Sequence, residues 1–186
     1  MSKVSELIII TGPPGAGKST VAAVVAKMVD RSALIAGDSF FGFLVDGILP
    51  WLSEAQAQNE IVTEAAASAA GRYAAGGYVT VYDGVVGPWF LTRFFSAARV
   101  DALHYAVLLP PVEVCIQRVR RRPTHGFTDA DVTRQIHHQF ASSSIPSTHL
   151  ILNPAEDPED AAAQIVAGFK AGAFRWPSSI RSVQTV

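Results

Sequence analysis

A glycine-rich segment near the N-terminus carries the clearest chemical signal in the chain. Residues 12–19 read GPPGAGKS, which matches the pattern G-x-x-x-x-G-K-[ST]. Glycines at these spacings let successive backbone N–H groups converge on phosphate oxygens, and the helix that begins there adds a partial positive charge. The pattern therefore predicts a phosphate-binding loop made of Gly12, Pro13, Pro14, Gly15, Ala16, Gly17, Lys18, Ser19 and Thr20.

Two side chains of this loop have separate expected tasks. The ammonium group of Lys18 is expected to reach the β- and γ-phosphates of a nucleotide, and the hydroxyl of Ser19 is expected to ligate Mg²⁺. The flanking sequence agrees, because an apolar run at Leu7–Ile10 predicts a buried strand and residues 18–29 predict a helix. The motif predicts nucleotide and Mg²⁺ binding, but it does not specify a reaction.

Two aspartates follow apolar runs that we expect to be neighbouring strands. Asp83 ends the run 78–82, and Asp38 comes shortly after the run 33–36. Ligands of open α/β sheets bind at the carboxyl ends of strands. We expect Asp83 to hold Mg²⁺ together with Ser19, and Asp38 to take the proton from an attacking hydroxyl. The two roles are open to exchange, and a turn or helix-cap role is the alternative for each aspartate.

An arginine cluster follows the fourth apolar run. Four of the eleven arginines lie within five positions, at Arg118, Arg120, Arg121 and Arg122. Arg118 and Arg122 are four residues apart and share one helical face, so we expect these two to stabilise negative charge on a transferred phosphoryl group. The alternative is that the cluster only complements the negative end of its helix. A lid is expected over about 118–140.

The elements that must position these residues alternate along the chain, which is typical of βαβ units. We expect strands at 7–10, 33–36, 78–82, 103–109 and 149–152, and helices at 18–29, 53–75, 110–121, 128–140 and 158–170. This pattern predicts a three-layer α/β fold with a five-stranded parallel sheet and a small helical lid. One domain is expected over residues 1–172, followed by a C-terminal tail at 173–186.

Composition narrows the class of protein further. The chain has 186 residues, of which 49% are hydrophobic and 17% charged, and its net charge is −1. With this net charge, the protein has no overall positive electrostatic field that would attract it to nucleic acid or to an anionic membrane, so we expect neither partner. A single cysteine, Cys115, rules out an intramolecular disulfide, and the first residues lack a signal-peptide layout, so a cytoplasmic location is expected. The oligomeric state stays open.

Taken together, these residues resemble a known family. The chain is similar to small P-loop kinases of the nucleoside-monophosphate-kinase-like fold, in particular the branch that contains chloramphenicol phosphotransferase, gluconate kinase and shikimate kinase. The resemblance extends from Ile8 to about Lys170, and it implies the strand order 2-3-1-4-5 and ATP-dependent phosphotransferase activity.

The resemblance also implies roles for individual residues. Asp38 is similar to the carboxylate that chloramphenicol phosphotransferases use as a base, and Asp83-Gly84 is similar to the Asp-Gly pair that ends the third strand of adenylate-kinase-like enzymes. Arg118 and Arg122 resemble the R-x-x-x-R of the lid. Asn153 falls where such kinases contact adenine, mainly through the backbone.

The segment expected to cradle the acceptor lacks cations. No lysine or arginine occurs from Ser32 through Gly71, although an anionic acceptor normally needs an arginine there. Arg72 and Arg93 are left as possible anion contacts. The large apolar residues of this region either line a pocket for an uncharged acceptor or belong to the core; they are Phe40, Phe41, Phe43, Leu44, Ile48, Leu49, Trp51, Leu52, Trp89 and Phe90.

The sequence thus predicts transfer of the ATP γ-phosphate to a hydroxyl of a small, mostly uncharged molecule. Two alternatives stay open: a kinase of an anionic acceptor such as a nucleotide or sugar acid, and a nucleotide-binding module with weak ATPase activity. The guanine-reading motif N-K-x-D is absent from the sequence, which favours adenine and argues against a switch protein. ATP, Mg²⁺ and a small hydroxyl compound are the expected ligands.

Overall fold

The chain forms a five-stranded parallel sheet in the order β2-β3-β1-β4-β5. The computed structural model describes residues 4–121, 128–152 and 157–176. This sheet confirms the predicted fold class and strand order. The strands are β1 (Glu6–Thr11), β2 (Ser32–Ala36), β3 (Val79–Asp83), β4 (Ala102–Leu108) and β5 (Leu150–Ile151).

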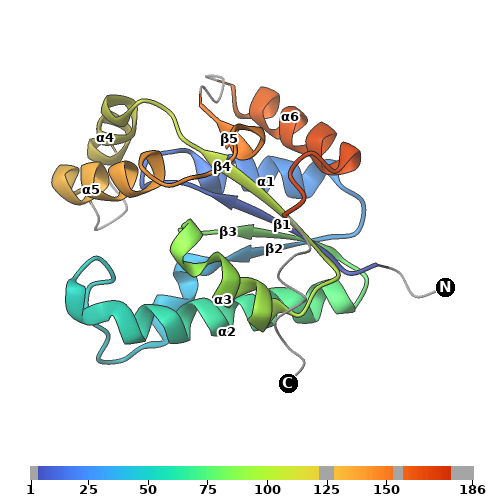
Figure 1. The fold of residues 1–186 in the computed structure, drawn as a ribbon, viewed down its shortest axis with the longest axis horizontal. Coiled ribbons are helices and arrows are strands. Elements are labelled where there is room, and N and C mark those ends of the chain that lie inside the picture. The colour runs from blue at the N-terminus through green and yellow to red at the C-terminus, as the bar shows by residue number, and fades with distance from the viewer. Residues whose placement is uncertain (1–3, 122–127, 153–156, 177–186) are drawn as a thin grey trace.

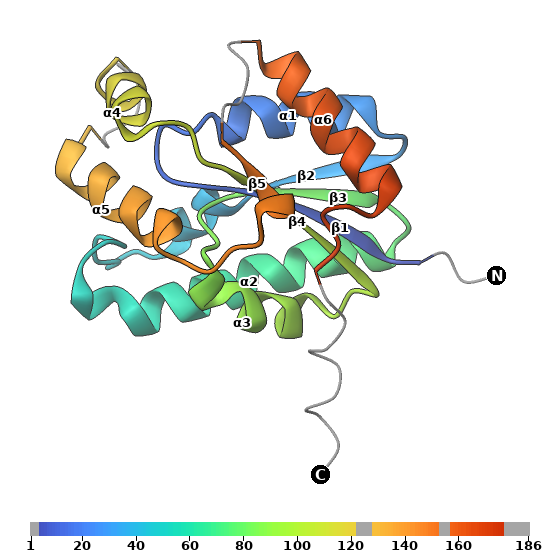
Figure 2. The same cartoon turned by 45° about the horizontal axis from the view of Figure 1, so that its top comes forward.

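Helices cover both faces of the sheet and form the expected three layers. Helices α1 and α6 lie on one face and α2 and α3 on the other, while α4 and α5 lie beyond the carboxyl ends of the strands (Figures 1 and 2). The helices are α1 (Lys18–Met28), α2 (Gln56–Ala75), α3 (Pro88–Ala98), α4 (Val112–Arg120), α5 (Ala130–Ala141) and α6 (Pro158–Ala171), and shorter 3₁₀ segments are Gly37–Phe43, Ser53–Ala55 and Ser147–His149.

Strand β1 occupies the centre of the core. Its residues Leu7, Ile8, Ile9 and Ile10 are fully buried. Side chains alternate across a strand, so Leu7 and Ile9 join the cluster under α2 and α3, and Ile8 and Ile10 join the cluster under α1 and α6. The loop that follows β1 therefore emerges at the middle of the sheet.

The strand register aligns the carboxyl ends of the three strands that matter for the site. Ile10 of β1 pairs with Asp83 of β3, and Asp83 pairs in turn with Ala36 of β2. Asp38 follows Ala36 by two residues, and Gly12 follows Ile10 by two. The phosphate-binding loop and both aspartates consequently lie at the same edge of the sheet.

Helix α3 is an element that the sequence analysis did not assign. Pro88 stands in its first turn, where the missing N–H costs nothing. Phe90, Leu91, Phe94 and Ala98 form its buried stripe against α2 and the sheet. The stripe has helical spacing, so the signal was present, but the dense aromatic residues of this segment were assigned only to a pocket or to the core.

The chain after α6 turns back onto the sheet. The N–H of Tyr105 donates to the carbonyl of Phe174 (2.8 Å), and the N–H of Trp176 donates to the carbonyl of Leu103 (2.8 Å). Residues 173–176 thus dock along β4. In the part of the chain that the structure describes, none of the helices combines the length and apolar character needed to cross a membrane.

Gly71 of α2 provides a test of the packing between α2 and α3. A Cβ at this position would lie 1.8 Å from the carbonyl oxygen of Ala98. Helix propensity alone predicts that Gly71→Ala stabilises the protein by about 1 kcal/mol. We expect the opposite, a loss of about 1–3 kcal/mol, because α3 must shift. Thermal melting measures the effect, and Gly42→Ala, which meets no atom within 4 Å, is the control. A raised Tm for Gly71→Ala would contradict this packing argument.

Candidate active site

The loop between β1 and α1 has the backbone shape that the motif requires. Gly12, Gly15 and Gly17 all have positive φ, at 144°, 79° and 96°. Gly17 caps the N-terminus of α1 in the left-handed conformation, and the N–H of Ala16 donates to the carbonyl of Pro13 (3.2 Å). A side chain at any of the three glycines would strain the backbone, which explains why they are glycines.

Two of these glycines also allow a close approach to other elements. A Cβ at Gly12 would lie 2.1 Å from the carbonyl oxygen of Leu108 at the end of β4. A Cβ at Gly15 would lie 2.2 Å from the carbonyl oxygen of Cys115 in α4. The loop therefore packs backbone against backbone, and its shape depends on β4 and α4.

Lys18 is held within this loop. The residue is 8% exposed, and its Nζ donates to the carbonyl oxygen of Pro13 (3.1 Å). This contact folds the ammonium group back across the loop. Lys18 also lines the cavity described next, and its contact with phosphate stays a prediction.

One cavity joins the loop to Asp38. It has a volume of about 590 Å³ and is lined by Lys18, Ser19 and Asp38, among other residues. Asp83 is not among the lining residues, although the register places it between β1 and β2 at the same edge. Further lining residues from the loop and strand ends are Pro14, Gly15, Gly37, Tyr82 and Val85.

Tyr82 is a lining residue that the sequence analysis missed. A Cβ at Gly37 would lie 2.1 Å from the Tyr82 hydroxyl. Because Gly37 has no side chain, the Tyr82 ring can pack directly against the backbone next to Asp38. Burial, together with the negative charges of Asp38 and Asp83, raises the pKa of Tyr82 above its ordinary value. The phenol of Tyr82 therefore stays protonated.

Arg118 lies over the phosphate-binding loop. One of its guanidinium nitrogens is 3.6 Å from the position of a Cβ on Gly17. Its neighbours Arg120 and Arg121 are exposed. Two other residues singled out from the sequence, Arg122 and Asn153, lie outside the described residues.

The rest of the cavity is lined mainly by apolar and neutral polar side chains. Of the ten apolar residues singled out from the sequence, five line it: Phe41, Trp51, Leu52, Trp89 and Phe90. Three others are exposed rather than in the core: Phe43, Ile48 and Leu49. The neutral polar residues come mainly from α2 and α5 and are Ser53, Gln56, Asn59, Thr63, Gln135 and Gln139. None of these six residues was a candidate from the sequence, because no local signal marks an amide that faces a cavity.

Arg72 and Arg93, the two possible anion contacts in the sequence, do not line this cavity. Arg93 forms ion pairs with Glu60 (3.1 Å) and Glu64 (2.6 Å) on the outside of α2 and α3. Arg72 is exposed and also does not line the cavity. Among the lining residues that the structure describes, Lys18 is the only lysine or arginine.

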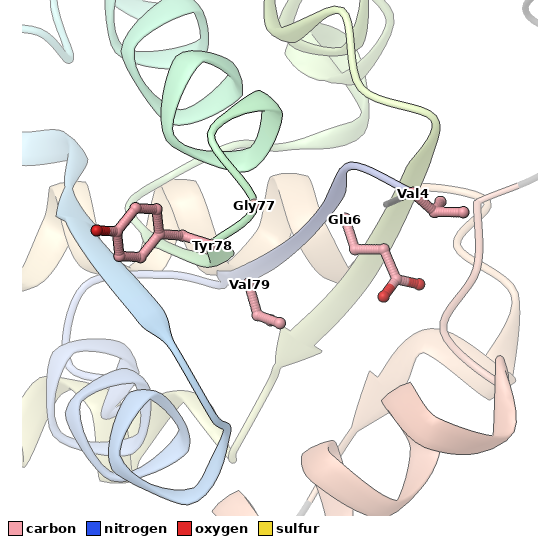
Figure 3. A pocket seen from close by; sticks show the side chains of 5 residues that line it. All are labelled: Val4, Glu6, Gly77, Tyr78 and Val79. Atoms are coloured by element: carbon pink, nitrogen blue, oxygen red, sulfur yellow. The ribbon is translucent and has the colours of Figure 1, made fainter. Parts of the chain in front are cut away.

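A smaller hollow of about 140 Å³ lies at the opposite edge of the sheet. It is lined by Val4, Glu6, Gly77, Tyr78 and Val79, at the amino ends of β1 and β3. Figure 3 shows the Glu6 carboxylate and the Tyr78 ring on either side of Val79. This hollow is remote from the phosphate-binding loop and does not bring a base and a nucleophile together.

Cys115 and His137, both among the described residues, lie outside the candidate site. Burial raises the pKa of the Cys115 thiol to about 11, so this cysteine stays protonated in the core. His137 contacts the carbonyl oxygen of Pro110 through Nε2 (2.9 Å). Within the described residues, no group of three His, Cys, Asp or Glu side chains could hold a metal ion. Ser19 and Asp83 carry oxygen atoms, the donor type that Mg²⁺ takes, and their joint binding of the ion stays a prediction.

Comparison with known proteins places the chain in a family. A family model described as an AAA domain matches residues 8–136, more than half of the 186 residues. The chain belongs to this AAA domain family. The matched range of the AAA domain contains the phosphate-binding loop, Asp38, Asp83 and Arg118. A search among curated proteins found no match.

Several solved structures share the fold of this chain over nine tenths of its length or more. A sugar kinase from Janibacter sp. HTCC2649 has a TM-score of 0.68 and 16% identity, covering 90% of this chain and 95% of that one. The Mycobacterium tuberculosis APS kinase CysC in complex with AMPPNP and APS has a TM-score of 0.66 and 16% identity, covering 90% and 98%. The Deinococcus radiodurans tunicamycin resistance protein has a TM-score of 0.64 and 14% identity, covering 93% and 99%. At these identities the likeness shows a P-loop fold.

The loop geometry predicts the effect of adding one methyl group. Gly15→Ala meets both a positive φ and the backbone of Cys115, whereas Gly172→Ala meets a similar φ of 71° with no atom within 4 Å. We expect both to lower the free energy of unfolding, Gly172→Ala by about 1–2 kcal/mol. Only Gly15→Ala should abolish nucleotide binding, because the loop must move away from α4. Calorimetric titration with ATP compares the two, and equal affinities would contradict the steric argument.

Proposed function

We propose that this protein is an ATP-dependent phosphotransferase that phosphorylates a hydroxyl of a small, mostly uncharged molecule. One observation carries the proposal. Asp38 shares a single cavity with Lys18 and Ser19, and the acceptor walls of that cavity hold no lysine or arginine among the described residues. Small-molecule kinases among the solved structures of similar fold support the same reaction class.

Asp38 is the proposed general base. It takes the proton of the acceptor hydroxyl as that oxygen attacks the γ-phosphorus. A bond forms between the acceptor oxygen and phosphorus, the bond from phosphorus to the β,γ-bridging oxygen breaks, and ADP leaves. The resemblance of Asp38 to the base of chloramphenicol phosphotransferases supports this assignment.

Lys18 and Arg118 are proposed to stabilise the charge of the transferred group. Lys18 reaches the phosphates from inside the loop, and Arg118 approaches the same loop from α4. Arg122 and the adenine contact near Asn153 remain proposals from the sequence. Mg²⁺ bound by Ser19 and Asp83 would neutralise part of the β- and γ-phosphate charge.

The base assignment is tested with Asp38→Asn in a screen of neutral hydroxyl compounds with ATP. We expect kcat to fall by about 10²–10⁴-fold, because the amide cannot accept the proton. The Kd for ATP should stay within a few-fold. Asp46→Asn changes an exposed carboxylate of the same region and is expected to leave both values unchanged.

Three outcomes would contradict parts of the proposal. Retained turnover by Asp38→Asn would remove Asp38 from the role of base. Turnover confined to anionic acceptors would instead indicate a nucleotide or sugar-acid kinase. ATP hydrolysis that no acceptor accelerates would indicate a nucleotide-binding module with weak ATPase activity.

Arg118 is tested against its neighbour on the same helix. Arg118→Ala is expected to lower kcat/KM by about 10²-fold, because a cation beside the transferred phosphoryl group is lost. Arg120 is two residues further on, which places it on the opposite side of α4, and it is exposed. Arg120→Ala should therefore have little effect in the same steady-state assay. Equal losses in the two variants would favour a general effect of helix charge.

A further inference from the structure

The segment before α2 exposes an unusual number of large apolar side chains. Within ten consecutive residues, five are exposed, and we refer to them as the apolar shelf: Phe43 (73%), Val45 (96%), Ile48 (43%), Leu49 (52%) and Leu52 (45%). Scattered apolar residues on a surface are ordinary, but a concentration of this kind marks a surface that binds something.

The backbone under the apolar shelf is held in place. Gln58 of α2 accepts a hydrogen bond from the N–H of Ile48 (2.8 Å) and donates one to its carbonyl (2.7 Å). Asn59 donates to the carbonyl of Pro50 (2.6 Å). These three bonds tie the segment to the first turns of α2, so its apolar side chains are displayed on a defined backbone. Such preorganisation lowers the entropic cost of binding.

The apolar shelf is continuous with the candidate active site. Pro50, Trp51 and Leu52 line the cavity that contains Asp38, and Leu52 belongs to both the cavity and the shelf. Trp89 lines the same cavity and is itself 45% exposed. An apolar surface therefore begins inside the cavity and extends outward.

The charges around the apolar shelf restrict what can bind there. No lysine or arginine occurs from Ser32 through Gly71, and the charged residues nearest the shelf in sequence are the acids Asp46 and Glu54. Within this segment, an anionic lipid surface or an acidic peptide would find no complementary charge. A neutral apolar group fits both the composition and the position of the shelf.

We propose that the apolar shelf is the outer part of the acceptor site, and that the acceptor is a neutral alcohol carrying an extended apolar chain. The hydroxyl-bearing end lies in the cavity near Asp38, and the chain leaves across Leu52 toward Leu49 and Ile48. This inference rests on the proposed function, because it names the class of acceptor for the same site.

The probe is a series of n-alkyl β-glucosides from methyl to octyl, used below their micellar concentrations. These compounds are neutral, carry hydroxyls at one end and differ only in chain length. Binding is followed by the fluorescence of Trp51 and Trp89, which line the cavity, and by calorimetry. We expect the Kd to fall by about two- to fourfold per methylene, because each CH₂ is removed from water. A Kd that does not change with chain length would overturn the proposal.

Two variants distinguish binding at the apolar shelf from a general effect of exposed apolar side chains. In the double variant Ile48→Ser, Leu49→Ser, the ratio of the methyl to the octyl Kd is expected to fall toward one. Ile61→Ser removes an apolar side chain that is 65% exposed on α2, two residues from both Asn59 and Thr63 and so on the face away from the cavity. It should keep the wild-type ratio, and an equal loss in this control would overturn the proposal. Thermal melting checks that both variants are folded.

Two further measurements distinguish this inference from its alternatives. Sedimentation shows whether a second copy covers the apolar shelf, and a dimer that the double variant dissociates would overturn the assignment to an acceptor. Phosphoryl transfer to short neutral alcohols without chain-length dependence would overturn the shelf proposal alone. Binding that depends on chain length without phosphoryl transfer would overturn the proposed function, while the apolar shelf would still be a binding surface.

Discussion

The close approach of the backbone of residues 12–17 to β4 and α4 is the constraint on which the rest of the site depends. Gly12 and Gly15 leave no space for a Cβ beside the carbonyls of Leu108 and Cys115. Because the loop is held against these elements, its N–H groups, the N-terminus of α1 and Lys18 are presented together. The central, fully buried β1 fixes where this loop emerges, and the parallel register brings the ends of β2 and β3 beside it.

The electrostatic organisation of the cavity follows from this arrangement. The described cations near it, Lys18 and Arg118, lie at the phosphate-binding loop. The acceptor walls offer aromatic rings, aliphatic groups and neutral amides instead. Burial and the charges of Asp38 and Asp83 raise the pKa of Tyr82, so a protonated hydroxyl also lines this cavity. Under the proposed function, this division would suit a triphosphate at one end and an uncharged molecule at the other.

Much of the fold could be predicted because its signals are local. The motif at residues 12–19, the apolar strands and the Asp129 cap of α5, which accepts from the N–H groups of Asp131 and Val132, each depend on a few neighbouring residues. Helix α3 was missed although Pro88 and its apolar stripe marked it. Tyr82, Gln56, Asn59 and Gln139 could not be assigned to the site, since their role depends on contacts between segments far apart in the chain.

The sequence by itself determined a glycine-rich P-loop motif, a parallel α/β fold and a segment at 32–71 without lysine or arginine, because residue type and short-range spacing are sufficient for each. Only the tertiary structure decided that Arg93 is engaged by Glu60 and Glu64, that Arg118 lies over the loop, and that Asp38 shares a cavity with Lys18. These facts depend on how α2, α3 and α4 pack against the sheet. Such packing is the sum of many weak long-range contacts, and no single stretch of sequence encodes it.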